Sequence, residues 1–170
     1  MCRFAHPAEI PPAELLAQCD IRFVRRSGPG GQHRNKVATA VVLRHRPTGV
    51  SAEASERRSQ AENREVALGR LRINLALELR GSRNGDAAPS ALWRSRCMGG
   101  QLRVAVAHED FPALLAEALD VLAAKRFDQR AASEVLGCTS TQLVRLLQKE
   151  PRAMARLNVE RERRGLPRLR

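Results

Sequence analysis

The sequence contains few aromatic residues and no tyrosine. Four phenylalanines and Trp93 are the only aromatic side chains among its 170 residues. Sheets that bind RNA by base stacking need several aromatic side chains on one face, so this mode of binding is poorly supported. Any contact with nucleic acid should therefore depend on arginine, backbone groups and surface shape.

Groups of metal ligands are also missing. The sequence has no Cys-x-x-Cys pair, and no histidine lies four residues from another. This spacing indicates neither a zinc knuckle nor a dithiol redox motif. We expect reduced thiols, no bound metal and no cofactor. The cysteines are Cys2, Cys19, Cys97 and Cys138, and the histidines are His6, His33, His45 and His108.

Long apolar runs are absent, and the N-terminus lacks the basic-then-apolar order of a signal peptide. We therefore expect a soluble, cytoplasmic protein without a membrane partner. Positive charge is in excess, with 30 Lys and Arg against 18 Asp and Glu, a formal charge of +12 and a pI near 11.3. This charge favours a polyanionic partner, nucleic acid first and a membrane surface second.

Three short strands are predicted in the first third of the chain. Residues 20–26 alternate apolar and basic side chains, which is typical of a half-buried strand. The β-branched run 39–45 predicts a second strand, and residues 47–49 (Pro-Thr-Gly) predict a turn into a third strand that ends near Ala54.

A long helix should follow this hairpin. Ser59 and Glu62 have the spacing of a capping box, and leucines recur at helical intervals as far as about Arg80. Residues 81–90 then lose all periodicity and collect Gly, Ser, Asn, Asp and Pro, which predicts a linker.

The second half is predicted to be mostly α-helical. After a brief apolar alternation at 102–106, helical spacing begins at Phe111. Asp128 is suited to cap a short helix that Gly137 would end, and Thr139 to cap the next one. Two short helices joined through one glycine resemble a helix-turn-helix.

Two interpretations of this helical pair remain open. One is a binding surface for rRNA, tRNA or a ribosomal factor, and the other is a small stabilising core. The exposed face would carry Thr139, Gln142 and Arg145, and the core would contain Ala131, Leu136, Leu143 and Leu147. Residues 152–170 are rich in arginine and predict a basic C-terminal tail.

The most unusual segment is residues 27–36, Ser-Gly-Pro-Gly-Gly-Gln-His-Arg-Asn-Lys. It matches neither the Gly-x4-Gly-Lys-Ser/Thr phosphate loop nor Gly-x-Gly-x-x-Gly. A flexible, Gly-rich hairpin loop is the simplest alternative. The tripeptide recurs at residues 99–101 without these flanks, and there we expect only a turn.

With its flanks, the first Gly-Gly-Gln resembles the signature of the class I peptide chain release factors and their shorter ribosome-rescue relatives. Residues 41–50 and 57–64 also resemble that family, so the likeness covers roughly residues 10–80. It implies that the loop enters the peptidyl transferase centre and promotes attack of water on the peptidyl-tRNA ester.

The resemblance assigns the catalytic role to Gly30, Gly31 and Gln32. Glycine permits close approach of the backbone, and the Gln32 N–H would stabilise developing negative charge, typically worth about 10²–10³ in rate. His33 is disfavoured as a general base because the mechanism depends on positioning. The resemblance also implies N5-methylation of Gln32 by a glutamine methyltransferase. The supporting loop residues are Ser27, Gly28, Pro29, His33 and Asn35.

A set of basic residues would contact phosphates of rRNA and peptidyl-tRNA on the ribosome. The alternative for each of them is a solvated charged surface. The set comprises Arg25, Arg26, Arg34, Lys36, Arg57, Arg58, Arg64, Arg161, Arg163 and Arg164.

We expect an α+β fold in which a small mixed β-sheet with a packed helix precedes a small, mostly α module. The expected divisions are a catalytic domain at 1–85, a linker at 86–100, a helix-turn-helix-like module at 101–151 and a tail at 152–170. With no room before the loop for a stop-codon reader, a monomeric, codon-independent rescue hydrolase is the leading hypothesis. A DNA-binding regulator and a ribosome-binding blocker are the alternatives.

Overall fold

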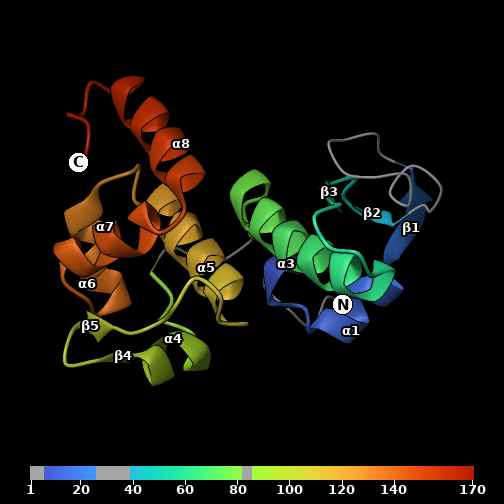
Figure 1. Ribbon diagram of the computed structural model, residues 1–170. Coiled ribbons are helices and arrows are strands. Elements are labelled where there is room, and N and C mark those ends of the chain that lie inside the picture. The colour runs from blue at the N-terminus through green and yellow to red at the C-terminus, as the bar shows by residue number, and fades with distance from the viewer. Residues whose placement is uncertain (1–5, 26–38, 82–85) are drawn as a thin grey trace.

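The computed structural model describes residues 6–25, 39–81 and 86–170 (Figure 1). It confirms the predicted α+β class. No helix in these ranges is both long and apolar enough to cross a membrane. In chain order the elements are η1 (Pro7–Glu9), α1 (Pro12–Ala17), β1 (Cys19–Val24), β2 (Ala40–His45), β3 (Ser51–Ala54), α3 (Gln60–Glu78), α4 (Ala91–Arg96), β4 (Cys97–Met98), β5 (Gln101–Leu102), α5 (Phe111–Ala124), α6 (Gln129–Leu136), α7 (Ser140–Gln148) and α8 (Pro151–Glu162).

The three predicted strands form one sheet in the order β1-β2-β3, and both pairings are antiparallel. Val41 and Leu43 of β2 are fully buried. Helix α3 packs against β2 and β3 on one side and against α5 on the other, so it lies between the sheet and the C-terminal helices (Figure 1). The sheet is thus supported by the longest helix described.

Helix α3 begins directly after Ser59, as predicted, but the predicted capping box is absent. Ser59 caps no backbone N–H with its side chain. The turn before the helix is held instead by Asn63, whose side-chain oxygen accepts a hydrogen bond from the Arg57 N–H at 2.9 Å. A side chain inside the helix has taken over the role expected at its N-cap.

The stretch expected as a linker, 86–100, contains helix α4 and strand β4. Ser90 caps α4 by accepting from the Trp93 N–H. Trp93 is fully buried, and its indole N–H donates to the Leu136 carbonyl at 2.8 Å. The predicted turn at the second Gly-Gly-Gln is confirmed, because Gly99 and Gly100 adopt φ of +57° and +74° between β4 and β5.

The predicted helical pair is confirmed with its caps. Asp128 accepts from two backbone N–H groups at the start of α6, Gly137 ends α6 in the left-handed conformation, and Thr139 caps α7. Of the apolar alternation at 102–106, only Leu102 lies in a strand, since β5 ends there. Val106, half exposed, lies beyond it.

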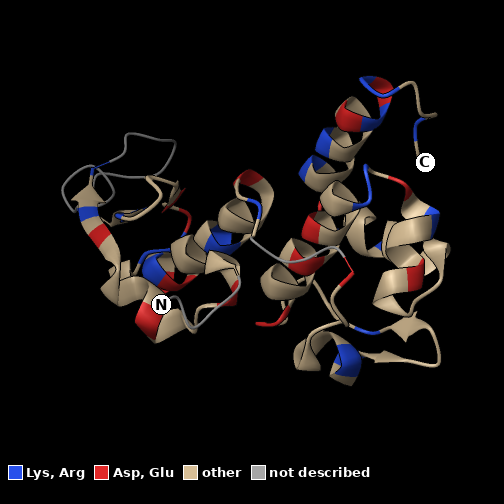
Figure 2. Cartoon of the chain, turned by 180° about the vertical axis from the view of Figure 1, so that it is seen from behind, with Lys and Arg blue, Asp and Glu red and all other residues tan. Residues whose placement is uncertain are grey.

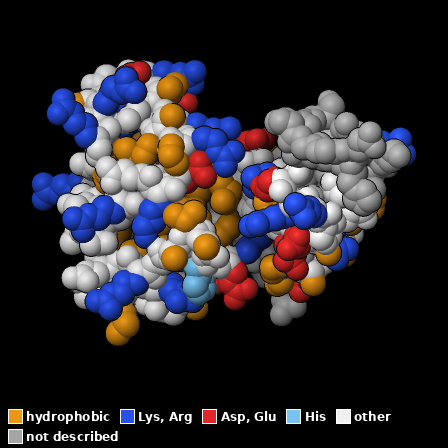
Figure 3. Space-filling model, in the orientation of Figure 1, with side chains coloured by type: hydrophobic (Ala, Val, Ile, Leu, Met, Phe, Trp, Pro, Cys, Tyr) orange, Lys and Arg blue, Asp and Glu red, His pale blue; other side chains and the backbone are white. Residues whose placement is uncertain are grey.

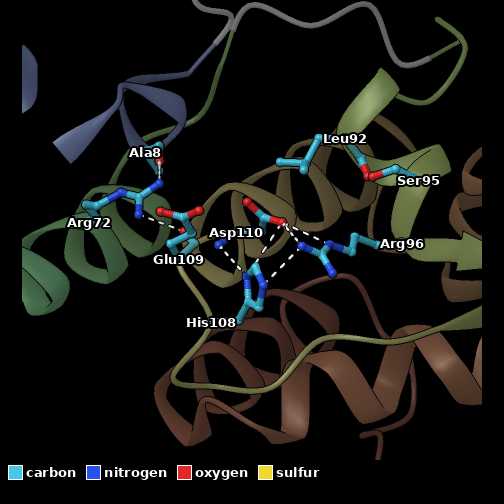
Figure 4. A network of polar contacts seen from close by, with 8 residues as sticks. All are labelled: Ala8, Arg72, Leu92, Ser95, Arg96, His108, Glu109 and Asp110. Carbon is cyan, nitrogen blue, oxygen red and sulfur yellow. Dashed lines mark hydrogen bonds and ion pairs between the residues drawn. The ribbon is translucent and has the colours of Figure 1, made fainter.

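Polar contacts join the two halves of the chain where α3 meets α5 (Figure 4). The buried Arg72 guanidinium of α3 donates to the carbonyls of Glu109, at 2.7 Å, and Ala8, at 3.2 Å. Within the second half, next to Glu109, Arg96 donates to the Asp110 carboxylate at 2.6 Å. A continuous apolar core also runs through both halves. The two halves are therefore closely packed. The predicted domain boundary after residue 85 stays a prediction.

The expected basic tail, 152–170, is largely a helix. Helix α8 extends to Glu162, and the residues after it fold back onto α8. Asn158 fixes this return through two hydrogen bonds with the Leu169 backbone, at 2.8 and 3.0 Å. Leu169 also packs against the apolar core, which includes Leu157 of α8, so the terminus is part of the module.

Protonation of His6 is expected to destabilise the fold at acidic pH. Its Nδ1 accepts from the Ala8 N–H at 3.0 Å, an arrangement that requires the neutral ring. Burial lowers the pKa of His6 below its ordinary value of 6.5, with the Asp120 carboxylate partly opposing. The unfolded chain therefore binds the proton more readily, and the free energy of unfolding should fall as pH drops below 6.5 towards the folded-state pKa.

Urea denaturation at about pH 7.5 and about pH 5.5 measures this effect. The variant His6→Asn keeps a side-chain acceptor at the N-cap but does not titrate, so it should lose less stability between the two pH values. His45, whose pKa burial also lowers, remains in both proteins. An equal loss in both would contradict the role of His6.

Candidate functional site

The Gly-rich loop predicted to carry the chemistry lies outside the described residues. The structure describes the two strands from which this loop leaves the sheet. Residues predicted as site residues that fall outside the described ranges are Arg26, Ser27, Gly28, Pro29, Gly30, Gly31, Gln32, His33, Arg34, Asn35 and Lys36.

The stem of the loop is the paired ends of β1 and β2. Val24, the last residue of β1, is the register partner of Ala40, the first residue of β2. The chain therefore leaves and re-enters the sheet on adjacent strands. β1 is an edge strand, and its Phe23 side chain is 49% exposed, so the stem stands at an open side of the sheet.

Asn63 of α3 fastens the stem to the rest of the domain. It is fully buried, and its amide nitrogen donates to the carbonyls of Thr39, at 2.8 Å, and Arg57, at 2.9 Å. Its oxygen accepts from the Arg57 N–H. One side chain thus uses both donors and its acceptor to join the residue before β2 to the turn before α3.

Asn63 is not among the site residues predicted from the sequence. A signal was nevertheless present, because Asn63 stands at the head of a helical stripe whose next members are Ala67, Leu71 and Leu75, all fully buried. A polar side chain on the apolar face of a helix must find hydrogen-bond partners. Here those partners are the backbone groups at the stem.

Four of the predicted RNA-contacting arginines surround this stem and are exposed. Among the described residues, their guanidinium groups have no hydrogen-bond or ion-pair partner. Arg70, one helical turn and a half from Arg64, differs because it pairs with Glu56. The stem therefore carries uncompensated positive charge. The four residues are Arg25, Arg57, Arg58 and Arg64.

The three C-terminal arginines predicted to bind RNA are engaged within the chain. Arg163 and Arg164 both pair with Glu160, and Arg164 lies over the Phe127 ring at 4.4 Å from its centroid. Acidic residues stand among the basic ones at the C-terminal end of α8 (Figure 2). Arg161 is 5% exposed and donates to the carbonyls of Pro167 and Phe127. The structure thus gives Arg161 a packing role.

Replacing Arg161 by glutamine is expected to lower the free energy of unfolding by about 2–3 kcal/mol, because two buried charge-assisted hydrogen bonds are lost. Arg163→Gln, which removes an equal charge from an exposed position, should change it by less than about 0.5 kcal/mol. Urea denaturation of the two variants makes the comparison. Equal stabilities would show that Arg161 does not hold the C-terminal return.

The cysteine thiols of the described ranges are unreactive. Burial raises the pKa of Cys19 and Cys97, and that of Cys138 to about 12. These thiols stay protonated near neutral pH and are poor nucleophiles. No group of three or more His, Cys, Asp and Glu side chains in this part of the chain is arranged to hold a metal ion.

Comparison with known proteins decides the family. The model of the RF-1 domain matches residues 8–103, which is more than half of the chain. The chain belongs to the RF-1 domain family. This confirms the family membership predicted from the loop and its flanks. The RF-1 match runs from η1 to β5. It includes the stem, Asn63 and the four exposed arginines around the stem.

Individual relatives are similar to part of this chain. An uncharacterized mitochondrial peptide chain release factor-like protein of Saccharomyces cerevisiae is 45% identical over 78 residues, which is 45% of this chain and 46% of that protein. The chloroplastic peptide chain release factor PrfB1 of Arabidopsis thaliana is 49% identical over 67 residues, 39% of this chain and 14% of that protein.

Peptide chain release factor 1 of Xylella fastidiosa is 36% identical over 99 residues, 54% of this chain and 27% of that protein. The chain therefore spans less than half the length of each of these relatives. Helices α5–α8 lie beyond the residues that the RF-1 family model matches.

Proposed function

We propose that this RF-1 domain promotes hydrolysis of the peptidyl-tRNA ester on the ribosome and releases the nascent peptide without reading a stop codon. The observation that carries the proposal is the Gly30-Gly31-Gln32 segment with its Ser-Gly-Pro flank, in a family-matched domain. Relatives that share this domain are named peptide chain release factors.

The chemistry of the loop rests on small residues and one backbone donor. Gly30 and Gly31 lack a side chain, so the backbone can approach the terminal adenosine of the tRNA closely. The Gln32 N–H would donate to the oxygen on which negative charge develops, and its side chain would shape the water site. The catalytic contribution is positioning and electrostatic stabilisation, without a general base.

The contacts of the described stem support this proposal. Asn63 joins Thr39, just after the loop, to the turn that carries Arg57. Displacing a reacting group by as little as 1 Å lowers the reaction rate strongly. The unpaired guanidiniums around the stem would bind phosphates of rRNA and tRNA and fix the orientation of the domain.

The partners that follow are the rRNA of the peptidyl transferase centre and peptidyl-tRNA, with a glutamine methyltransferase acting on Gln32. We propose a monomer that acts in the compartment where its ribosomes translate. The relatives include chloroplastic, mitochondrial and bacterial release factors, and for this chain we propose the cytoplasm. Release without a codon rests on the resemblance to short rescue factors.

Release of labelled peptide from purified ribosomes tests the proposal. One set of ribosomes is stalled on truncated message, and a second set carries a stop codon in the A site. Peptide release from the first set should be at least as fast as release from the second. Release only with a stop codon would show that the chain depends on decoding. Binding to stalled ribosomes without any release would favour the blocker.

A further inference from the structure

A second surface with unpaired positive charge lies on the C-terminal module. Residues 100–104 run alongside α7 over its whole length. At one end the Gly100 carbonyl accepts from the Thr139 N–H at 3.3 Å, and at the other the Val104 carbonyl accepts from the Lys149 ammonium. The strand and the helix therefore form one continuous surface.

The side chains of both elements are sorted between the core and this surface. Leu102 and Val104 are buried, whereas Gln101 and Arg103, which alternate with them, are exposed. Helix α7 buries one apolar face in the same way, consisting of Leu143, Leu146 and Leu147. Its exposed face carries Thr141, Arg145 and Gln148.

The charge on this surface is of one sign. Helix α7 contains no acidic residue, and over α6, α7, β4 and β5 the charged side chains visible in Figure 3 are Lys and Arg. Among the described residues, the guanidiniums of Arg103 and Arg145 have no hydrogen-bond or ion-pair partner. Glu134, the acidic residue of the neighbouring helix, is already paired with Arg130 at 3.3 Å.

This arrangement contrasts with other exposed arginines of the same module. Arg152 pairs with Glu150 and Arg168 with Glu162. Their charge is compensated within the chain, so they offer little to an external anion. The α7 face, defined by Gln101, Arg103, Thr141, Arg145 and Gln148, combines free guanidiniums with amide and hydroxyl donors. These groups are the common ligands of phosphate oxygens.

We propose that the α7 face binds the phosphate backbone of a structured RNA and anchors the protein there. The choice of RNA over DNA rests on the proposed function, since the ribosome and tRNA supply the polyanion. A helix with one arginine and an adjacent extended segment with another are suited to contacting phosphates across a groove. The contact would fix position and would not depend on base sequence.

Binding of the full chain to a labelled RNA duplex of arbitrary sequence tests the proposal, measured across a range of salt concentrations. The double variant Arg103→Gln and Arg145→Gln should bind about tenfold more weakly. The slope of log K against log salt should fall by roughly 1–2, as expected for the loss of two phosphate contacts. Both residues are exposed and unpaired, so thermal unfolding should be unchanged.

The matched control is Arg130→Gln with Arg168→Gln, which removes the same charge from paired arginines on the same module. It should bind RNA within about twofold of the wild type. Equal binding by the two double variants would overturn the proposal. So would a preference for one DNA sequence that depends on Arg103 and Arg145, because that would identify a DNA-binding regulator.

Peptide release separates this proposal from the proposed function. The Arg103→Gln and Arg145→Gln protein should need a higher concentration for half-maximal release and should reach the same maximal rate. Suppose that the wild type releases no peptide, while this variant shows the expected loss of RNA affinity. That result would refute the proposed hydrolase activity and support the RNA-binding role of the α7 face. Reduced maximal release with unchanged RNA affinity would overturn the face as an anchor.

Discussion

Replacing Gly31 by alanine is expected to reduce peptide release at saturating protein by about 10²-fold or more. Under the proposed function, a methyl group at this position would block the close approach of the backbone and displace the neighbouring Gln32 N–H from the reacting oxygen. Losing one such donor in an acyl-transfer site typically costs about 10²–10³ in rate. Single-turnover release of labelled peptide measures the effect.

The chain contains a matched control in its second Gly-Gly-Gln. Gly100 adopts φ of +74°, and a Cβ there would come no closer than 3.7 Å to Thr139. Gly100→Ala should therefore cost about 1–2 kcal/mol of stability, for the left-handed conformation, and leave the maximal release rate unchanged. Ribosome binding by Gly31→Ala should persist. Unimpaired release by Gly31→Ala would remove the catalytic assignment of the loop.

The elements with complete local signals were predicted well. Asp128, Gly137 and Thr139 each act at one helix end, where a cap or a left-handed residue is a local requirement. The strands around 20–26 and 39–45 have alternating or β-branched patterns that need no distant information. Their observed boundaries differ from the predicted ones by no more than two residues.

Helix α4 escaped prediction because its stability is not local. Its six residues are too few to show helical periodicity, and Gly, Ser and Pro before it indicate a loop. The helix is held by Trp93, which reaches the Leu136 carbonyl more than forty residues away. Tertiary burial of one aromatic side chain decides the conformation, and no sequence window contains both partners.

The roles of the arginines also depend on tertiary contacts rather than on local sequence. Sequence identifies an excess of positive charge but not which guanidiniums are compensated. Arg161 and Arg163 are two residues apart, and yet one is buried against carbonyl groups while the other is exposed beside Glu160. Arg145, predicted to lie on an exposed face, is exposed and, among the described residues, has no partner for its guanidinium, as is also true of Arg103. Ion pairing, rather than charge, separates candidate RNA contacts from structural ones.

Removing the Asn63 side chain is expected to affect both stability and release. Asn63→Ala leaves the Arg57 N–H and the carbonyls of Thr39 and Arg57 without their partner. Buried groups left unsatisfied cost about 1–3 kcal/mol each, and water entering the space recovers part of this. We expect the free energy of unfolding to fall by about 2–4 kcal/mol.

The release rate of Asn63→Ala should fall by more than the fraction of unfolded protein accounts for. Loss of the Asn63 bond frees the Thr39 carbonyl at the start of β2, and under the proposed function a displacement of about 1 Å at the stem is enough to lower the maximal rate by roughly 10- to 100-fold. The assay belongs at a temperature where circular dichroism shows the variant fully folded. Asn74→Ala is the control on the same helix, because Asn74 bonds the Ser51 carbonyl, far from the stem. A maximal rate for Asn63→Ala equal to that of Asn74→Ala would mean that Asn63 stabilises the domain without positioning the loop.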